Sequence, residues 1–235
     1  MDAHGAVHLS DLRATHLRRV LHATPGQAVR IGLIDGPFGE GIVTDVVEER
    51  VSLRCTFDAT PPSRPAIDLL LAVPRPKVLR RLWPQLAALG VGRVILTNAA
   101  KVERNYFDTH FLQPAIVRPL LLEGLQQARD TRVPQVSIHR QFKVLVEDHL
   151  DGLCPEELRL VAHPGEAPPV AEAARLAAGG RVLLAVGPEG GWTDYELALL
   201  LAHGFRQASM GARTLRTDTA CVALLALAHN GKLHA

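Results

Sequence analysis

The sequence predicts an α/β protein with a mostly parallel sheet, preceded by a small β-barrel. From residue 67 onward, short apolar runs alternate with helical patterns, which is typical of a parallel sheet covered by helices on both faces. Before residue 60, short β-rich segments are separated by turn residues, which is typical of a small barrel. With 47% hydrophobic residues in 235, the chain has enough apolar side chains to build a core.

The N-terminal part is expected to contain short strands joined by tight turns. Residues 60–65, Thr-Pro-Pro-Ser-Arg-Pro, form a stiff polar stretch that is typical of a linker. We therefore expect two domains, residues 1–66 and residues 67–235. The strands are predicted at 29–33, 41–47 and 51–55, and the turns at 25–26, 35–37 and 48–49.

The C-terminal part is expected to alternate strands and helices to the end of the chain. Short apolar runs predict strands at 67–73, 93–97, 133–138, 158–162, 181–186 and 206–210. Apolar residues at helical spacing predict helices at 78–89, 112–129, 170–178, 194–203 and 217–230. The last helix is apolar on every side between residues 220 and 228, so we expect it to be buried in the core or in a subunit interface.

Several classes of protein are disfavoured by what the sequence lacks. No apolar run reaches the ~18 residues of a membrane span, and the N-terminal residues do not match a signal peptide. Cys55, Cys154 and Cys221 form neither a CxxC pair nor a disulfide framework. No metal-binding motif such as HExxH is present. We expect a cytoplasmic protein that needs neither a metal nor a membrane.

The net charge of +2 conceals a basic middle third. Residues 67–150 hold 12 Lys and Arg against 7 Asp and Glu, a net charge of +5, whereas both flanking parts are slightly acidic. A basic patch of this kind is typical of a nucleic-acid binder, but a solvated helix face has the same composition. Charge alone leaves both interpretations open.

The most informative segment is a glycine-rich turn between a predicted strand and a predicted helix, Gly187-Pro188-Glu189-Gly190-Gly191. Glycines let the backbone approach a ligand closely, and ligands bind at the carboxyl ends of strands in open α/β sheets. Thr193 and Glu196 match a capping box at the start of the helix. The segment is neither a Rossmann GxGxxG nor a P-loop, which disfavours a dehydrogenase, and its composition alone fits a tight structural turn equally well.

Two further segments place polar residues at predicted strand ends. In 209–220, a loop with Arg213, Arg216 and three threonines leads into the apolar last helix, which is typical of a functional loop on a rigid base. A helix start also needs capping groups, so Arg216 and Thr217 are equally consistent with a structural role. His163 and Pro164 begin a turn after another strand, where a lone histidine is more often a structural polar group than a catalyst.

Together and in order, these three segments resemble the RsmE-type 16S ribosomal RNA uridine-N3 methyltransferases of the SPOUT superfamily. The resemblance rests on 187–191, on Arg213-x-Leu215-Arg216-Thr217-Asp218-Thr219-Ala220 and on His163-Pro164. The stretch His16-Leu17-x-Arg19-Val20-Leu21 is similar to the start of that family's PUA-like RNA-binding barrel. The chain departs from the family pattern at 83–88 and 126–130, which leaves the particular RNA target open.

The resemblance implies a fold, a cofactor and partners. The fold is a PUA-like barrel followed by a SPOUT domain, whose C-terminal segment forms a trefoil knot and binds S-adenosylmethionine. The implied partners are ribosomal RNA or the small ribosomal subunit, and a second copy of the chain in a homodimer with its sites at the interface. The implied cofactor contacts are His163, Pro164, Gly187, Pro188, Glu189, Gly190, Gly191, Ser209, Met210, Gly211, Leu215, Thr217, Thr219 and Ala220.

Methylation of uridine N3 requires loss of the N3 proton, because that nitrogen is protonated at neutral pH. Arg213 or Arg216 would stabilise the developing negative charge, and Glu189 would accept the proton or order the turn. The predicted function is S-adenosylmethionine-dependent methylation of uridine N3 in 16S ribosomal RNA. The alternatives are a methyltransferase with another RNA target and a non-catalytic ribosome-assembly protein. RNA phosphates would meet the basic residues Arg19, Arg75, Lys77, Arg80, Arg104 and Arg132.

Overall fold

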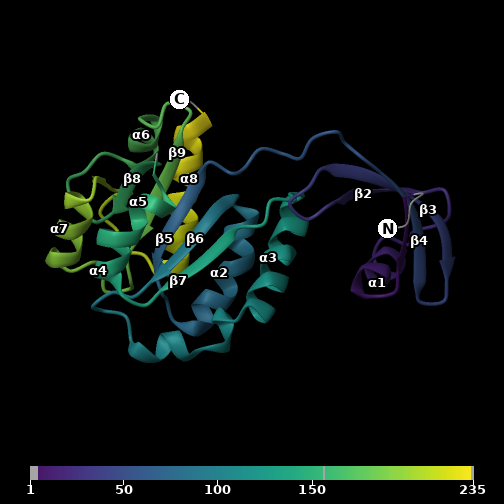
Figure 1. Cartoon of the computed structure of the whole chain (residues 1–235), viewed down its shortest axis with the longest axis horizontal. Helices are drawn as coiled ribbons and strands as arrows, with labels where there is room; N and C mark the ends of the chain where they lie inside the picture. The colour runs from purple at the N-terminus through teal and green to yellow at the C-terminus, as the bar shows by residue number, and fades with distance from the viewer. Residues whose placement is uncertain (1–4, 156, 234–235) are drawn as a thin grey trace. The chain divides into compact units, whose positions relative to one another are not determined.

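The computed structural model describes residues 5–155 and 157–233, which divide into two units (Figure 1). Unit 1 holds the described residues up to Ser63 together with Asp130–Arg132. Unit 2 holds residues 64–129 and the described residues from Val133 onward. The sequence placed the boundary after residue 66, slightly further along the chain than Ser63, where the first segment of unit 1 ends. The sequence did not predict that 130–132 belong with unit 1.

Unit 1 contains the strands β1 (Ala6–Leu9), β2 (Ala28–Gly32), β3 (Phe38–Val47) and β4 (Arg50–Phe57) and the helix α1 (Leu12–Arg19). The strands form an antiparallel sheet in the order β1-β4-β3-β2. Alternate residues such as Val43, Val51 and Leu53 are buried against Ala14 and Leu17 of α1, as expected for a sheet with one buried face. The sequence predicted the last three strands and missed β1 and α1.

Residues 130–132 join unit 1 through hydrogen bonds. Thr131 Oγ1 donates to the Gly36 carbonyl at 2.6 Å, and Thr131 is buried. The Arg132 guanidinium donates to two carbonyl oxygens, those of Pro62 at 2.7 Å and Asp35 at 3.0 Å. These bonds use backbone acceptors far away in the sequence, so local patterns in the sequence do not reveal them.

Unit 2 contains a six-stranded sheet in which every pair of neighbouring strands is parallel. Its strands are β5 (Ile67–Ala72), β6 (Val91–Thr97), β7 (Gln135–His139), β8 (Glu157–Ala162), β9 (Arg181–Val186) and β10 (Phe205–Ala208). Their order is β10-β8-β9-β5-β6-β7, and every residue of the central strand β5 is buried. The predicted α/β fold is therefore confirmed, with a parallel sheet in unit 2 and, where a small β-barrel was predicted, a small barrel-like antiparallel sheet in unit 1.

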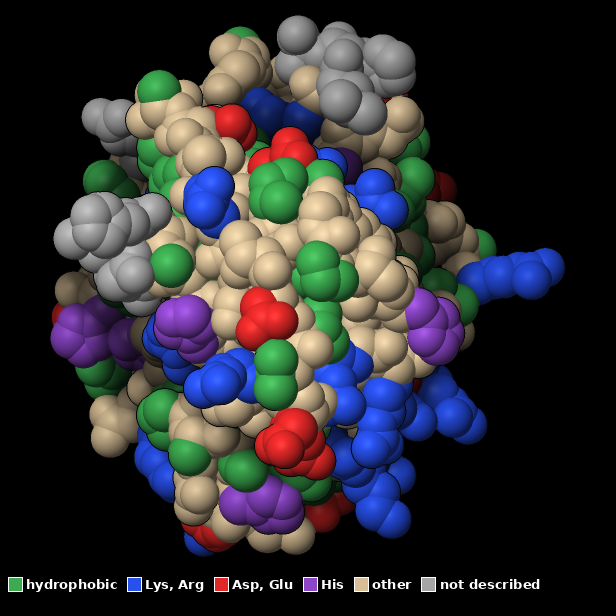
Figure 2. Space-filling view, turned by 90° about the vertical axis from the view of Figure 1, so that its right-hand side faces the viewer, with side chains coloured by type: hydrophobic (Ala, Val, Ile, Leu, Met, Phe, Trp, Pro, Cys, Tyr) green, Lys and Arg blue, Asp and Glu red, His purple; other side chains and the backbone are tan. Residues whose placement is uncertain are grey.

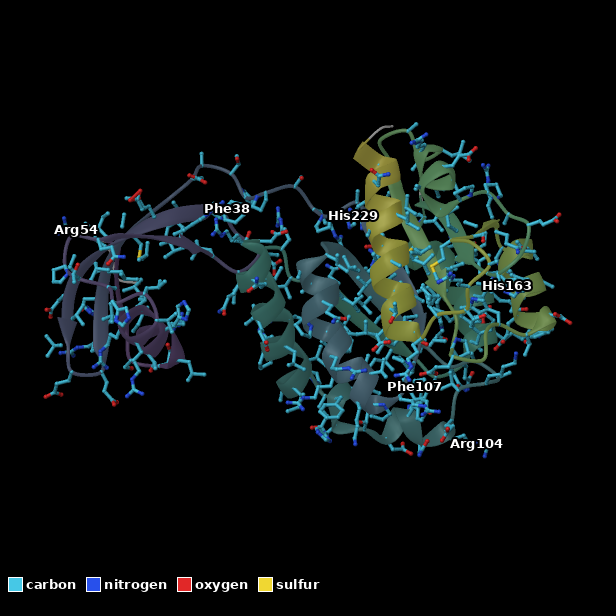
Figure 3. The ribbon with its side chains drawn as sticks, turned by 180° about the vertical axis from the view of Figure 1, so that it is seen from behind. Phe38, Arg54, Arg104, Phe107, His163 and His229 are labelled. Carbon is cyan, nitrogen blue, oxygen red and sulfur yellow. The ribbon has the colours of Figure 1, made fainter. Side chains whose placement is uncertain are left out.

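Helices cover both faces of this sheet (Figures 1 and 3). One face carries α2 (Pro76–Ala88), α3 (Pro114–Ala128), α6 (Val170–Arg175) and α8 (Thr217–Leu233), and the other carries α4 (Phe142–Val144), α5 (Leu150–Leu153) and α7 (Asp194–Ala202). Right-handed crossovers explain the division, because connections that move toward β7 and toward β10 must cross opposite faces. The short helical turns are η1 (Arg104–Asp108), η2 (His110–Leu112) and η3 (Leu145–His149).

The last helix returns from the edge of the sheet to its centre. After the edge strand β10, α8 contacts α2, α6, β5 and β9. Leu224, Leu225 and Ala228 are buried, whereas Leu227 is 36% exposed, so this chain covers only one side of the apolar helix. The threading of this segment as a knot stays a prediction. Within the described residues, no helix is both long enough and apolar enough to cross a membrane.

A buried carboxylate joins three strands of unit 2, and the sequence did not single it out. Asp68 of β5 is 0% exposed. Its Oδ1 accepts from Arg181 Nη2 of β9 at 2.6 Å, and its Oδ2 lies 3.5 Å from Arg93 Nη1 of β6. Gly92 leaves room for this group, because a Cβ there would lie 2.8 Å from Asp68 Oδ1. The ion pairs lie near the amino ends of these strands.

Substitution of Asp68→Ala is expected to lower the free energy of unfolding by about 3–5 kcal/mol, because it removes the carboxylate from a buried ionic group. Asp108 is the matched control, since its carboxylate is 73% exposed and lies 3.9 Å from Arg140. Asp108→Ala is expected to change stability by less than about 1 kcal/mol. Urea denaturation measures both values, and equal losses for the two variants would contradict this assignment.

Candidate functional site

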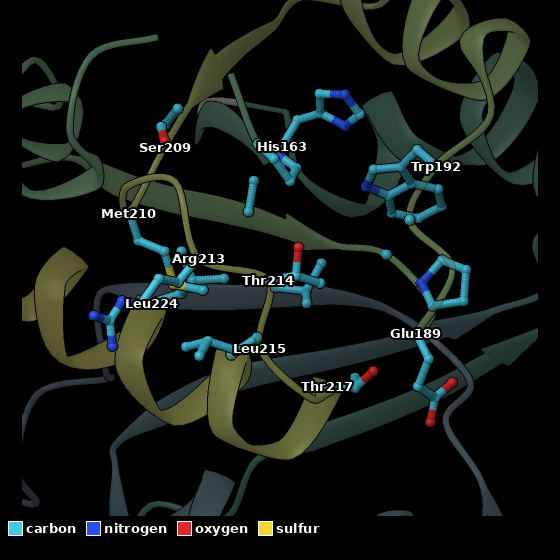
Figure 4. A pocket seen from close by; sticks show the side chains of 18 of the residues that line it. His163, Glu189, Trp192, Ser209, Met210, Arg213, Thr214, Leu215, Thr217 and Leu224 are labelled. Carbon is cyan, nitrogen blue, oxygen red and sulfur yellow. The ribbon is translucent and has the colours of Figure 1, made fainter. Parts of the chain in front are cut away.

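A cavity lies at the carboxyl ends of β8, β9 and β10 (Figure 4). Three turns bound it, 162–164 after β8, 186–192 after β9 and 208–215 after β10, and the first turns of α8 close it. Parallel strands present their carboxyl ends at the same edge, so turns that are distant in the sequence meet there. The cavity therefore brings together the three segments that the sequence analysis singled out.

The turn after β9 is shaped by glycine and by the helix that follows. Gly191 N donates to the Pro188 carbonyl at 2.8 Å, and Gly191 has a φ of +71°, a left-handed conformation that favours glycine. The predicted capping box of α7 is confirmed. Thr193 Oγ1 accepts from Glu196 N at 3.3 Å, and Glu196 Oε2 accepts from Thr193 N at 2.9 Å. The capping box fixes the point at which the turn ends.

Glu196 also ties this turn to a loop elsewhere in the sheet. Glu196 is only 3% exposed. Its Oε1 accepts a hydrogen bond from the backbone N of Ala100, in the loop after β6, at 2.7 Å. In the same loop Lys101 Nζ donates to the Gly190 carbonyl at 2.7 Å. A Cβ on Gly190 would lie 2.7 Å from Lys101 Cδ, so the two residues pack closely. The loop after β6 thus supports the turn after β9, although β5 lies between those strands.

The loop after β10 is held by its neighbours. His163 N, at the end of β8, donates to the Ala208 carbonyl at 3.1 Å, so the turns after β8 and β10 lie side by side. Gly211 N donates to Ser209 Oγ at 3.1 Å, and Gly211 has a φ of +106°. Thr217, the first residue of α8, is 3% exposed and lines the cavity. These contacts connect the loop to the sheet on one side and to α8 on the other.

The cavity wall is largely apolar and carries few charges. Glu189 and Arg213 line it, and both residues are exposed. Its buried ring nitrogens His163 Nδ1 and Trp192 Nε1 have no hydrogen-bond partner within the described part of the chain. The apolar surface comes from Ala162, Val186, Ala208, Met210, Leu215, Ala220 and Leu224. Such a wall suits a flat, mostly uncharged ligand.

Cys221 of α8 is not a candidate nucleophile. The residue is fully buried, and this burial raises the pKa of its thiol to about 12. The thiolate is the reactive form, so the protonated thiol acts as a core side chain. Among the residues that the structure describes, no group of three or more His, Cys, Asp and Glu side chains is arranged to hold a metal ion.

Most of the residues predicted to contact a cofactor line this cavity. Gly190 and Thr219 do not, because Gly190 faces Lys101 and Thr219 lies on an exposed part of α8. Of the catalytic candidates, Glu189 and Arg213 line the cavity, whereas Arg216 lies outside the lining and is exposed. The predicted residues on the lining are His163, Pro164, Gly187, Pro188, Glu189, Gly191, Ser209, Met210, Gly211, Leu215, Thr217 and Ala220.

The sequence analysis missed several lining residues. Ala162, Val186 and Ala208 are the last residues of their strands, a position that the strand pattern itself indicates. Leu224 lies one helical turn after Ala220, so helical spacing would have found it. Thr214 lies between two predicted residues, and Trp192 directly follows the glycine turn. No local signal shows that the Trp192 indole turns inward.

The residues predicted to bind RNA fall in both units. Arg75, Lys77 and Arg80 are exposed at the start of α2. Arg104, which is labelled in Figure 3, is exposed in η1. In unit 1, Arg19 ends α1 and is exposed, whereas Arg132 is engaged by the two carbonyl oxygens described above. Figure 2 shows Lys and Arg side chains exposed on the face turned to the viewer. Of these exposed side chains, Arg80 also lies over the Phe111 ring, with its Cζ atom 5.9 Å from the ring centroid.

Substitution of Glu196→Ala is expected to lower the free energy of unfolding by about 1–3 kcal/mol, because it deprives the N–H groups of Ala100 and Thr193 of their acceptor. Glu123→Ala on the exposed surface of α3 is the matched control and is expected to change stability by no more than about 0.5 kcal/mol. Urea denaturation of both variants measures the difference. A Glu196 variant as stable as the control would show that this carboxylate does not hold the turn.

Comparison with known protein families identifies related chains. The model of the RNA methyltransferase domain matches residues 61–229. The Ribosomal RNA small subunit methyltransferase E of Treponema pallidum is 31% identical over 240 residues, covering 97% of this chain and 89% of that protein. Ribosomal RNA small subunit methyltransferase E 1 of Borreliella burgdorferi is 22% identical, covering 92% of this chain and 89% of that protein.

Solved structures show the same fold. A Ribosomal RNA small subunit methyltransferase E from Neisseria gonorrhoeae, bound to S-adenosyl methionine, has a TM-score of 0.76 at 21% identity and covers 96% of this chain and 92% of its own. A methyltransferase from Legionella pneumophila with the cofactor SAM has a TM-score of 0.69 at 21% identity, covering 95% and 91%. Because the family model spans most of the chain and the T. pallidum relative nearly all of it, the chain belongs to the RsmE family of RNA methyltransferases.

Proposed function

We propose that this chain transfers a methyl group from S-adenosylmethionine to N3 of a uridine in 16S ribosomal RNA. The observation that carries the proposal is the cavity at the carboxyl ends of β8, β9 and β10, in a chain of this family. The T. pallidum relative is named for methylation of small-subunit ribosomal RNA, and two similar structures hold S-adenosylmethionine. The choice of uridine N3 rests on the resemblance of the sequence to its family.

The residues of the cavity fit this methyl donor. An adenine ring needs apolar walls and accessible backbone groups, and Met210, Leu215 and Leu224 with the glycine turn supply both. The sulfonium carries a positive charge, and the acidic side chain of Glu189 lies on the same cavity. When bound, the donor supplies an electrophilic methyl group and leaves as a neutral thioether. The protein must then align the methyl carbon with N3 and exclude water.

Glu189 accepts the N3 proton of the target uridine. The N3 lone pair is nucleophilic only after a base has removed the hydrogen. Arg213 lines the same cavity, and its guanidinium stabilises the negative charge that develops on the uracil oxygens. Arg216 is exposed outside the lining, just before α8, and we assign it to an RNA phosphate.

Exposed basic side chains bind the RNA backbone. Arg75, Lys77, Arg80 and Arg104 meet phosphates from unit 2, and unit 1 supplies a second RNA-binding part with Arg19. Phosphate contacts fix the position of the RNA but do not read its sequence. These residues therefore provide affinity, and the identity of the methylated nucleotide depends on the cavity and on bases that reach it.

The departures from the family pattern bear unequally on the RNA target. In 83–88, Trp83, Leu86 and Ala87 are buried and only Gln85 and Ala88 are exposed, so the change there concerns mostly the packing of α2. Residues 126–129, at the end of α3, are exposed, so this departure changes a surface that RNA can reach. A change of target would therefore depend on 126–129 more than on 83–88.

The enzyme works as a homodimer in the cytoplasm, where ribosomal subunits are made. A second hollow, lined in part by Leu227 of α8, shares Pro164, Ser209, Met210 and Gly211 with the cavity. Leu227 is 36% exposed and lies on the side of α8 that this chain leaves uncovered, whereas Leu224, Leu225 and Ala228 are buried. A second copy that covers Leu227 would contact the wall of the cavity itself, which supports a site at the dimer interface.

Ribosomal RNA from a strain that lacks this protein is expected to lose 3-methyluridine from the small-subunit RNA. The nucleoside should return when the intact gene is restored, because the proposed reaction forms the N3–methyl bond directly. Mass spectrometry of nucleosides from purified 16S ribosomal RNA measures both results. An unchanged nucleoside profile would rule out this substrate and leave the alternatives of another RNA target or a non-catalytic role.

Substitution of Glu189→Gln is expected to lower kcat by about 100-fold or more, because the amide cannot accept the N3 proton. The assay uses small-subunit RNA from the strain without the protein, so that the target position is unmethylated. Glu172→Gln, an exposed glutamate of α6, is the matched control and should retain full activity. If the Glu189 variant keeps kcat within twofold of the wild type, another group is the base.

A further inference from the structure

Two buried polar atoms on the cavity wall have no partner on the described chain. Trp192 is 4% exposed, and its Nε1 has no hydrogen-bond acceptor, while His163 Nδ1 is buried and likewise unpaired. Buried polar groups are nearly always paired, and an unpaired one costs stability. The other tryptophan follows this rule, because Trp83 Nε1 donates to the Phe111 carbonyl at 3.0 Å. Other buried polar atoms of the described residues also have no partner, but only these two lie on the cavity wall, where a ligand can supply one.

The Trp192 ring and the backbone of His163 are both held in place by their surroundings. The Trp192 ring packs on Phe142, with centroids 5.4 Å apart. The N–H edge of this ring lies close to Gly187: a Cβ at residue 187 would lie 3.2–3.3 Å from Trp192 Cδ1, Nε1 and Cε2. Only glycine at this position therefore leaves the N–H edge uncrowded. The backbone of His163 is fixed by its bond to Ala208. Figure 4 shows both rings toward one side of the cavity, with Met210 and Leu215 toward the other.

The chemistry of the two atoms selects the ligand group. An indole N–H can only donate a hydrogen bond, whereas an imidazole nitrogen without a hydrogen can only accept one. A hydroxyl satisfies both, because its single oxygen accepts one bond and donates another. The charged lining residues Glu189 and Arg213 are exposed and lie on other turns, so a ligand carboxylate beside the two rings would lack a buried charged partner.

We propose that Trp192 Nε1 and His163 Nδ1 together bind one ribose hydroxyl of the adenosyl methyl donor, with Trp192 donating and His163 accepting. This inference rests on the proposed function, because it takes S-adenosylmethionine as the ligand of the cavity. It makes these two residues determinants of specificity for a ribonucleoside, since a donor that lacks the hydroxyl would leave two buried polar atoms unpaired.

Isothermal titration calorimetry of the full chain with S-adenosylhomocysteine and its 2′-deoxy and 3′-deoxy analogues tests the donor half of the pair. Trp192→Phe keeps an aromatic ring against Phe142 and removes the N–H. This variant is expected to bind S-adenosylhomocysteine about 5- to 10-fold more weakly than the wild type. One of the two deoxy analogues lacks the hydroxyl that Trp192 binds. The wild type and Trp192→Phe are expected to bind this analogue equally, because the hydrogen bond from the indole is absent in both complexes.

Two variants of His163 test the acceptor half independently. His163→Asn keeps an oxygen acceptor near the position of Nδ1, whereas His163→Leu removes the acceptor. The first is expected to bind S-adenosylhomocysteine within about twofold of the wild type and the second about 5- to 10-fold more weakly. Melting temperatures without ligand show whether each variant is folded. If Trp192→Phe does not fold, the comparison of His163→Asn with His163→Leu still tests the inference.

The outcomes separate this inference from the proposed function. If Trp192→Phe binds like the wild type, or loses the same affinity for all three ligands, the indole acts only by packing and the inference is wrong. Equal binding by His163→Leu and His163→Asn would also overturn it. If the folded wild type binds neither S-adenosylmethionine nor S-adenosylhomocysteine, the proposed function fails first, and the inference fails with it.

Discussion

All six strands of unit 2 run in the same direction, and this constraint creates the site. In a parallel sheet the carboxyl ends of all strands lie at one edge, so the turns after β8, β9 and β10 meet although they are far apart in the sequence. Each turn alone is a short loop with a few hydrogen bonds. Together with α8, which packs back onto β5 and β9, they enclose a cavity.

Two buried carboxylates brace the two ends of this sheet. Asp68 joins β5, β6 and β9 near their amino ends through Arg181 and Arg93. Glu196 works at the opposite end, where it joins the loop after β6 to the turn after β9 through Ala100. A buried carboxylate costs desolvation free energy unless hydrogen bonds or cations compensate it, so each fixes its neighbours in one arrangement. The rigid frame lets the glycine turn keep its shape at the cavity.

The parallel sheet and the three site segments could be predicted because their signals are local. Alternating strands and helices, the glycine run at 187–191 and the capping box are all read from neighbouring residues. The link from Glu196 to Ala100 spans 96 residues, so no local pattern indicates it. The same holds for the placement of 130–132 with unit 1. The inward turn of Trp192 depends on packing against Phe142, so sequence reading found the three turns that bound the cavity but missed this residue among others of its wall.

Hydrogen–deuterium exchange of the full chain, with and without saturating S-adenosylmethionine, tests most directly whether the three turns form one cofactor site. Binding slows exchange where backbone groups become ordered or protected. We expect slower exchange in 162–165, 187–193 and 209–217 together, with no change in β2, β3 and β4 of unit 1. Protection of one turn alone, or of none at a donor concentration that saturates binding, would contradict the central claim.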